Sequence, residues 1–176
     1  MSIAWVFPGQ GSQKVGMADQ LLSISGAHER FSLASDLLGR DLLAICRGKS
    51  GGGDGPDELN DTRNTQPALF VVESLLVDNL IKQGREASMV AGHSLGELVA
   101  LYAAGVFDLE TGLTLMKTRS ELMAAAGGGG DRLVHRVDDA AVLRGVQPAA
   151  AHSGRSAQGL PLWERGDLAA RRDAPK

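Results

Sequence analysis

The sequence predicts an α/β fold in which a mainly parallel β-sheet is flanked by helices. Two short apolar segments, residues 3–7 and 88–91, are predicted to be strands, and helical sequence follows each of them. Strands that alternate with helices are typical of parallel sheets. The chain has 176 residues, of which 43% are hydrophobic, so it is long enough to bury a core.

Helices are predicted on both sides of the second strand from hydrophobic spacing and capping residues. Residues 19–46 are expected to be helical and amphipathic in parts, whereas the glycine-rich stretch at residues 49–61 is expected to be a surface loop. Residues 95–104 form a predicted helix after the second strand. A further helix is expected to begin after Asp108, a good N-cap residue, and to end at Gly127.

The segment from residue 65 to residue 82 has a strong helical pattern. Asn64 or Thr65 can cap its N-terminus, Pro67 suits its first turn, and Gly84 can end it. Its apolar side chains recur at helical spacing, at Leu69, Val72, Leu76 and Leu80. The segment is therefore expected to form a helix that leads into the second strand.

Residues 92–97, Gly-His-Ser-Leu-Gly-Glu, lie between the second predicted strand and the helix that follows it. A Gly-x-Ser-x-Gly sequence in this context places Ser94 on a sharp turn beside a helix N-terminus, where glycines avoid steric clashes. Free backbone N–H groups at that terminus, that of Leu95 first, can hydrogen-bond an oxyanion. The pattern predicts a nucleophilic serine, and the alternative is a chance match in a glycine-rich chain.

A second motif, at residues 5–13, closes the first strand with a loop rich in glycine and amide side chains. Ligands bind outside the carboxyl ends of parallel strands, so this loop and the Ser94 turn can face one pocket. The backbone of Gln10 can then supply a second oxyanion donor. A phosphate-binding loop is disfavoured because the glycines and Lys14 do not have the spacing of either nucleotide-binding motif.

Four features together, residues 7–13, 64–68 and 92–97 and Arg119, resemble the malonyl-CoA:acyl carrier protein transacylases of fatty acid synthesis. The acyltransferase domains of polyketide synthases share most of these features. The resemblance runs from about residue 3 to residue 126. It implies an α/β hydrolase-like fold and an acyltransferase that moves malonyl from coenzyme A, through a serine ester, to the phosphopantetheine thiol of acyl carrier protein.

The resemblance also implies roles for individual residues. Ser94 is implied to be the acyl-accepting nucleophile, the backbones of Gln10 and Leu95 the oxyanion donors, and Arg119 the residue that binds the malonyl carboxylate. Arg119 lies on the apolar flank of its predicted helix, where a guanidinium must reach water or an anion, and its planar fork fits a carboxylate. The alternative is a surface arginine paired with a carboxylate. His93 is interpreted as structural, because neighbours in such a turn point in different directions.

Composition and spacing exclude several classes of function. The formal net charge of −3 and the lack of a basic patch disfavour nucleic acid as a partner, and no apolar segment is long enough to predict a membrane span. The histidines form no pair with ligand spacing, and Cys46 is the single cysteine, so no metal site is predicted. No cofactor is expected, because the coenzyme A thioester is the substrate. The single cysteine and the absence of secretory features favour the cytoplasm.

Residues 127–176 differ in composition from the preceding 126 residues, which the resemblance implies are the N-terminal part of an acyltransferase catalytic domain. This tail is rich in Ala, Gly and Arg, shows no sustained strand pattern and is expected to be disordered or frame-shifted. A reading-frame slip or gene-model error in the glycine run at 127–130 would produce such a change. The alternative is a true short variant.

The tail limits the expected activity, because the inserted subdomain, later strands and catalytic histidine of the family are not recognisable in it. The tail contains His135 and His152, but neither lies in a motif that matches the family, so neither is assigned the role of the catalytic base. Losing the histidine of a serine site can lower turnover by on the order of a million-fold. We therefore expect an incomplete sheet and a poorly active or inactive chain. A serine esterase is a weaker alternative, because it gives no reason for Arg119.

Overall fold

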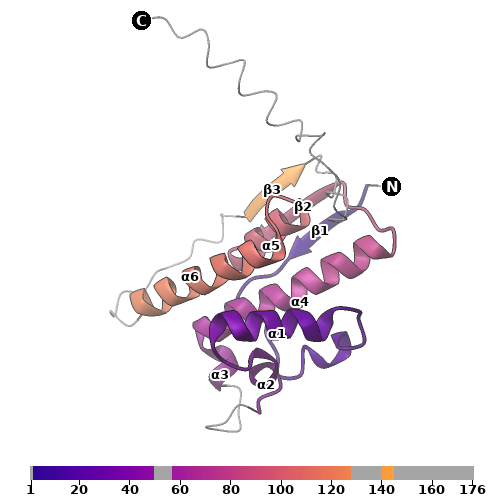
Figure 1. The fold of residues 1–176 in the computed structure, drawn as a ribbon. Coiled ribbons are helices and arrows are strands. Elements are labelled where there is room, and N and C mark those ends of the chain that lie inside the picture. The colour runs from indigo at the N-terminus through magenta and orange to yellow at the C-terminus, as the bar shows by residue number, and fades with distance from the viewer. Residues whose placement is uncertain (1, 50–56, 128–139, 145–176) are drawn as a thin grey trace, which may run out of the picture.

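The computed structural model describes residues 2–49, 57–127 and 140–144, and it contains a three-stranded sheet with helices against it (Figure 1). The strands are β1 (Ala4–Phe7), β2 (Met89–His93) and β3 (Ala140–Arg144), in the order β1-β2-β3. β1 and β2 are parallel, with Phe7 opposite Gly92. The α/β class and both predicted strands are confirmed.

β3 was not expected, because it lies in the tail, where the sequence shows no sustained strand pattern. It pairs antiparallel with β2, so that Ala140 lies opposite His93. Five residues that include two adjacent alanines are too few to show a strand periodicity, and pairing with a neighbour determines the structure of such a segment. The remaining residues predicted to form the tail, 128–139 and 145–176, lie outside the described residues.

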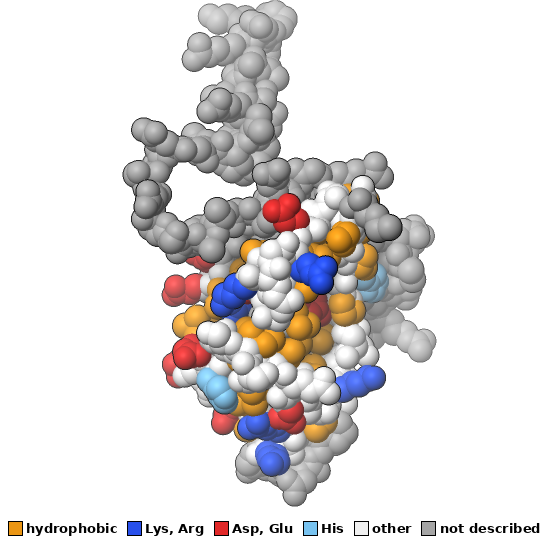
Figure 2. Space-filling view, turned by 90° about the vertical axis from the view of Figure 1, so that its right-hand side faces the viewer, with side chains coloured by type: hydrophobic (Ala, Val, Ile, Leu, Met, Phe, Trp, Pro, Cys, Tyr) orange, Lys and Arg blue, Asp and Glu red, His pale blue; other side chains and the backbone are white. Residues whose placement is uncertain are grey.

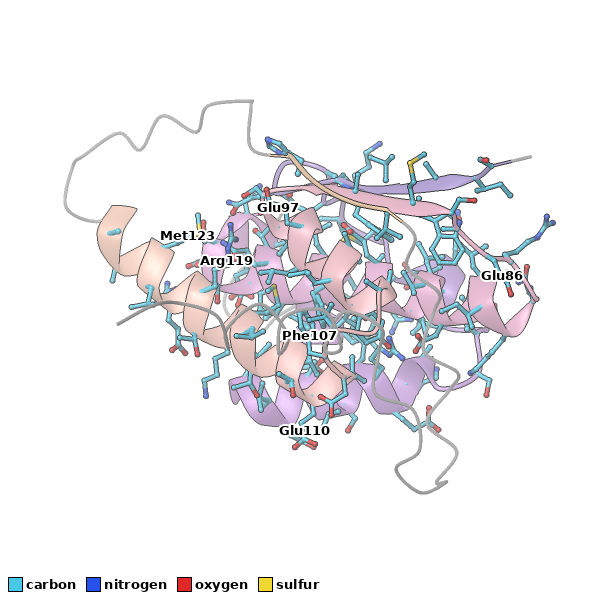
Figure 3. The ribbon with its side chains drawn as sticks, turned by 90° about the horizontal axis from the view of Figure 1, so that it is seen from above. Glu86, Glu97, Phe107, Glu110, Arg119 and Met123 are labelled. Carbon is cyan, nitrogen blue, oxygen red and sulfur yellow. The ribbon has the colours of Figure 1, made fainter. Side chains whose placement is uncertain are left out.

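The helices form layers on one side of the sheet, as Figure 3 shows from above. α5 (Leu95–Ala103) packs on the strands, and α4 (Thr62–Lys82) packs against α5 and along α6 (Leu109–Gly127). The short helices α1 (Ala27–Leu38), α2 (Leu42–Cys46) and α3 (Asp57–Asn60) lie against α4, and a single 3-10 turn, η1, spans Asp19–Leu21. This packing places the N-terminal ends of α4 and α5 close to the C-terminal half of α6.

The predicted helical region at residues 19–46 is divided into η1, α1 and α2. α1 ends at Gly39, whose positive φ of 69° is a conformation that glycine adopts without strain. Asp41 then caps α2 by accepting a hydrogen bond from the Ala44 N–H at 2.9 Å. The predicted loop at 49–61 was wrong in its last residues, because they form α3. Four residues are too short a helix to show a hydrophobic period.

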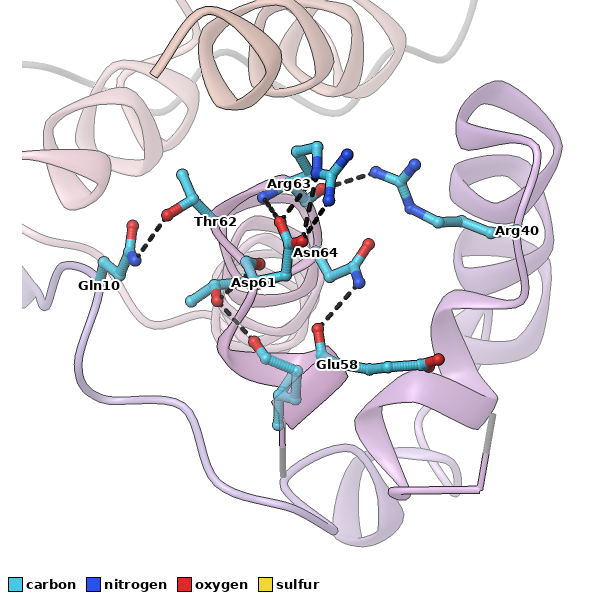
Figure 4. Close-up of polar contacts among 9 residues, drawn as sticks. Gln10, Arg40, Glu58, Asp61, Thr62, Arg63 and Asn64 are labelled. Carbon is cyan, nitrogen blue, oxygen red and sulfur yellow. Dashed lines mark hydrogen bonds and ion pairs between the residues drawn. The ribbon is translucent and has the colours of Figure 1, made fainter. Parts of the chain in front are cut away.

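The start of α4 also differs from the prediction. Asp61 caps the helix by accepting a hydrogen bond from the Arg63 N–H at 2.9 Å, so Pro67 lies inside the helix rather than in its first turn. Proline has no N–H and leaves the carbonyl four residues earlier without its helical partner. That carbonyl belongs to Arg63, and it accepts a hydrogen bond from Arg40 Nη2 at 2.8 Å (Figure 4). A side chain from outside the helix thus compensates for the internal proline.

Apolar surface remains exposed on the described part of the molecule. Val6, on the edge strand β1, is 73% exposed, and Leu122, on α6, is 66% exposed. Figure 2 shows one face on which hydrophobic side chains gather at the centre, with charged side chains around them. An apolar side chain on a sheet edge and another on a helix face are positions that a partner element would ordinarily cover.

Glu73 is an unusual residue for the interior of α4, because its side chain is buried and neither carboxylate oxygen has a hydrogen-bond partner. Burial raises the pKa of Glu73 from 4.5 to about 8. Between these two pH values the folded chain holds a proton that the unfolded chain releases. Stability therefore falls as the pH rises from 4.5 to about 8, with a slope of at most about 1.4 kcal/mol per pH unit.

The variant Glu73→Gln is expected to remove this decline, because an amide does not ionise. Urea unfolding curves of the parent and the variant should agree near pH 4.5 and diverge toward pH 8, with the variant more stable. Glu86→Gln is the matched control, since Glu86 is exposed and its replacement should leave the pH dependence intact. Parallel stability curves for the parent and Glu73→Gln would show that Glu73 is ionised in the folded chain.

Candidate active site

Ser94 occupies the turn between β2 and α5, as the sequence predicts. It is the N-cap residue of α5, with φ 54° and ψ −105°. Among the described residues it is the only non-glycine residue with positive φ. Residues with side chains rarely adopt this conformation, and strain of this kind is concentrated at functional sites. The turn holds the Ser94 side chain at the N-terminal end of α5.

Two glycines make this turn possible, because the chain segments on either side of it touch. A Cβ atom on Gly92 would lie 2.0 Å from the carbonyl oxygen of Gly96. A Cβ atom on Gly96 would lie 2.2 Å from the carbonyl oxygen of Phe7 and 2.6 Å from that of Pro8. The Gly-x-Ser-x-Gly pattern is therefore a steric requirement of the contact between α5, β2 and the end of β1.

Gly96→Ala is expected to destabilise the fold by more than about 3 kcal/mol, because both clashing atoms are backbone atoms that cannot rotate away. Gly84→Ala is the matched control. Gly84 has a positive φ of 72°, unlike Gly96 within α5, and no atom beyond its two chain neighbours lies within 4 Å of its Cβ position, so only the left-handed strain of about 1–2 kcal/mol should appear. Denaturant unfolding measures both losses. Equal losses for the two variants would mean that the contact with Phe7 can relax.

The N-terminal loop lies against the Ser94 turn and is hydrogen-bonded to the end of α3 and the start of α4. A Cβ atom on Gly9 would lie 2.7 Å from the carbonyl oxygen of His93. The side chain of Gln10 donates a hydrogen bond to Thr62 Oγ1 at 3.0 Å (Figure 4), and Gln13 donates to Asn60 Oδ1 at 2.9 Å. The loop containing Gln10 therefore adjoins the turn before Leu95, the first residue of α5.

Arg119 reaches Ser94 from α6. Its Nη2 donates a hydrogen bond to Ser94 Oγ at 3.0 Å, and its Nη1 donates to Gln66 Oε1 at 2.5 Å. Asp108 caps α6 by accepting from the Thr111 N–H at 2.8 Å, so the predicted start of that helix is confirmed. The structure thus brings together two of the predicted site residues that are 25 positions apart in the sequence.

The guanidinium of Arg119 is half-buried, and both of these hydrogen-bond acceptors are neutral. Burial lowers the pKa of Arg119, while the negative charge of Glu97, in the first turn of α5, acts in the opposite direction. Figure 3 shows Arg119 on α6 with Met123 beside it. A partly desolvated cation held by neutral acceptors is suited to receive an anion.

Gln66 is a site residue that was not predicted as one from the sequence, where it stands only within the motif at residues 64–68. The side chain is fully buried on α4, and besides accepting from Arg119 its Nε2 donates a hydrogen bond to Met123 Sδ at 3.2 Å. A glutamine among apolar helix positions is the signal that could have identified it, because a buried amide requires partners.

His93 is exposed and lies beside the N-terminal loop, where its Nδ1 is 3.0 Å from the Cβ position of Gly9. The structural role expected for His93 stays a prediction. His135 and His152 lie outside the described residues. In the part of the chain that the structure describes, no group of three or more His, Cys, Asp or Glu residues could hold a metal ion, and no helix is long and apolar enough to cross a membrane.

Comparison with known proteins identifies relatives for most of the chain. A family model described as "Acyl transferase domain" matches residues 4–156, which extends past residue 126, where the resemblance was expected to end. The malonyl CoA-acyl carrier protein transacylase of Synechocystis sp. is 52% identical over 129 residues, which are 73% of this chain and 42% of that protein. Its crystal structure has a TM-score of 0.66 and covers 72% of this chain and 41% of that one.

Two further similar proteins come from polyketide biosynthesis. The polyketide biosynthesis protein ThaF of Burkholderia thailandensis is 45% identical over 158 residues, which are 83% of this chain and 13% of that protein. A structure titled PlMCAT:AntF, a type II polyketide synthase acyl carrier protein with its malonyl-transacylase, is 39% identical, with a TM-score of 0.64. It covers 72% of this chain and 40% of that one.

Proposed function

The chain belongs to the acyl transferase domain family, and on this basis we propose that Ser94 accepts a malonyl group from coenzyme A and passes it to acyl carrier protein. The acceptor atom on the carrier is its phosphopantetheine thiol, and the process is fatty acid biosynthesis in the cytoplasm. The chain spans 42% of the length of the Synechocystis relative, so both transfer steps are part of the proposal.

The contact between Arg119 Nη2 and Ser94 Oγ carries this proposal. A malonyl ester on Ser94 has its free carboxylate carbon three bonds from Oγ, so the carboxylate falls in the neighbourhood of the guanidinium. The planar fork of an arginine binds a carboxylate through two hydrogen bonds. The same contact disfavours a simple esterase, which needs no cation beside its nucleophile.

In the first step, Ser94 Oγ forms a bond to the thioester carbonyl carbon and the carbon–sulfur bond breaks. The hydroxyl proton ends on coenzyme A, which leaves as the thiol. The backbone N–H groups of Gln10 and Leu95 are proposed to donate to the carbonyl oxygen while it carries negative charge. In the second step the carrier thiol attacks the serine ester, and its proton returns to Ser94.

Both steps need a base that removes a proton from Ser94 or from the carrier thiol. Within residues 2–49, 57–127 and 140–144, no histidine is hydrogen-bonded to Ser94. We therefore expect malonyl loading of this chain to be slow. The alternative is that the chain is an inactive truncated or frame-shifted fragment of such an enzyme. A polyketide-type acyltransferase is the second candidate, and the similarity to ThaF favours it.

The proposal is tested by prolonged incubation of the full chain with malonyl-CoA, proteolysis and mass spectrometry of the peptides. We expect a malonyl ester on Ser94. Cys46 is the internal comparison, because burial raises the pKa of its thiol to about 12 and leaves almost no thiolate to react. A malonyl adduct on Cys46 or on another residue, with Ser94 unmodified, would overturn the proposal.

A further inference from the structure

We infer that Gln66 and Met123 are positioning residues that together hold the Arg119 guanidinium against Ser94. The side-chain amide of Gln66 connects α4 to two residues of α6, and its orientation decides what it can hold. Its consequence for malonyl binding rests on the proposed function, whereas its consequence for the motion of Arg119 does not.

At the junction of α4 and α6, the side chain of Gln66 contacts both Arg119 and Met123. Gln66 Oε1 accepts from Arg119 Nη1 at 2.5 Å, and Gln66 Nε2 donates to Met123 Sδ at 3.2 Å. Arg119 and Met123 are four residues apart and so lie on one face of α6 (Figure 3), and both contact Gln66. Each end of the buried amide therefore has its own partner on the same neighbouring helix.

The chemistry of these partners permits one orientation of the amide. A guanidinium has only donors, so the oxygen of Gln66 must face Arg119. A thioether sulfur has only acceptor capacity, so the NH2 group must face Met123. Because Gln66 is fully buried, water cannot satisfy either end in place of these two side chains. The sulfur of Met123 thus stabilises the rotamer in which Gln66 holds Arg119.

Replacing the sulfur should release this arrangement. In Met123→Leu the volume is nearly kept but the acceptor is lost, and the buried NH2 group of Gln66 has no partner. The Gln66 side chain then leaves this rotamer for others in which its NH2 group finds an acceptor, and in those rotamers Oε1 no longer reaches Arg119. Arg119 loses the contact at Nη1 and turns about its terminal bonds more freely, so its Nη2 spends less time on Ser94.

The direct test is side-chain NMR of the full chain with 15N-labelled arginine, which measures the rotation rate of the Arg119 guanidinium. We expect slow rotation in the parent and rotation at least fivefold faster in Met123→Leu. Met116→Leu is the matched control, because Met116 is a buried methionine on the same helix without this contact, and the rate should not change. Met123→Gln should restore slow rotation, since its side-chain oxygen can accept from Gln66.

A second measurement titrates monomethyl malonate, which carries the single carboxylate of a malonyl ester, and follows the Arg119 resonances. Met123→Leu should weaken its binding at least fivefold relative to the parent and to Met116→Leu. If the parent does not bind the probe but the rotation rates change as expected, the positioning inference stands and the proposed function fails. If Met123→Leu folds and leaves the rotation rate of Arg119 unchanged, or if Met123→Gln folds and does not rotate slowly, the inference is wrong.

Discussion

Replacing Ser94 with alanine is expected to abolish malonyl loading from malonyl-CoA completely. Ser94 has the hydroxyl that accepts from Arg119 and stands at the N-terminus of α5, and the only cysteine is buried with a raised pKa. No other described side chain combines a nucleophilic atom with this cation. Intact-mass measurement of the parent and Ser94→Ala after equal incubation gives the loaded fraction of each.

Ser32→Ala is the control for this experiment, since Ser32 is an exposed serine on α1. Its loading should equal that of the parent. The fold of Ser94→Ala should be retained, because alanine keeps the Cβ atom and removes only the hydroxyl. Persistent loading of Ser94→Ala at the parent rate would show that the malonyl group is captured elsewhere and that the turn is not the acceptor site.

Replacing Arg119 with alanine is expected to lower the ratio of malonyl to acetyl loading at least tenfold, which corresponds to roughly 1.4 kcal/mol. The guanidinium is half-buried, and acetyl would leave it facing an acyl group without a charge. Arg119→Ala should therefore reduce malonyl loading while acetyl loading stays the same or increases. Competition between malonyl-CoA and acetyl-CoA in one reaction, read by mass spectrometry, measures the ratio.

Arg119→Lys should recover part of the ratio at most, because lysine keeps the charge but loses the planar fork. Arg85→Ala is the matched control, since Arg85 is exposed in the connection between α4 and β2. If the ratio is the same in Arg119→Ala, Arg85→Ala and the parent, Arg119 does not select the dicarboxylate, and selection must reside in other residues.

The elements with a strong local signal were predictable from the sequence. The turn at Ser94 was one, because a strand, two glycines and a helix occur within a few residues, and the glycines proved to be sterically necessary. The start of α6 was another, because Asp108 is a good N-cap residue and accepts from the Thr111 N–H. The Asp108 cap and the contact between Gly92 and Gly96 lie between residues close in the chain, whereas the contact of Gly96 with Phe7 and Pro8 adds a distant constraint.

The features that escaped prediction depend on contacts between distant residues. Pro67 indicated a first turn, yet it lies within α4 because Arg40, from the segment between α1 and α2, satisfies the carbonyl that the proline leaves free. β3 was not expected because its five residues acquire strand structure only by pairing with β2. The contact of Gln66 with Arg119 and Met123 joins two helices, and no spacing within either one encodes it.

The central claim is that Ser94 and Arg119 form one site for an acyl group with a free carboxylate. A crystal structure of the chain after malonyl loading tests this most directly. We predict a malonyl ester on Ser94 whose carboxylate accepts two hydrogen bonds from the Arg119 guanidinium, in place of the present contact with the hydroxyl. A malonyl ester whose carboxylate points into solvent, with Arg119 still bound to Gln66 and no contact to the carboxylate, would contradict the claim.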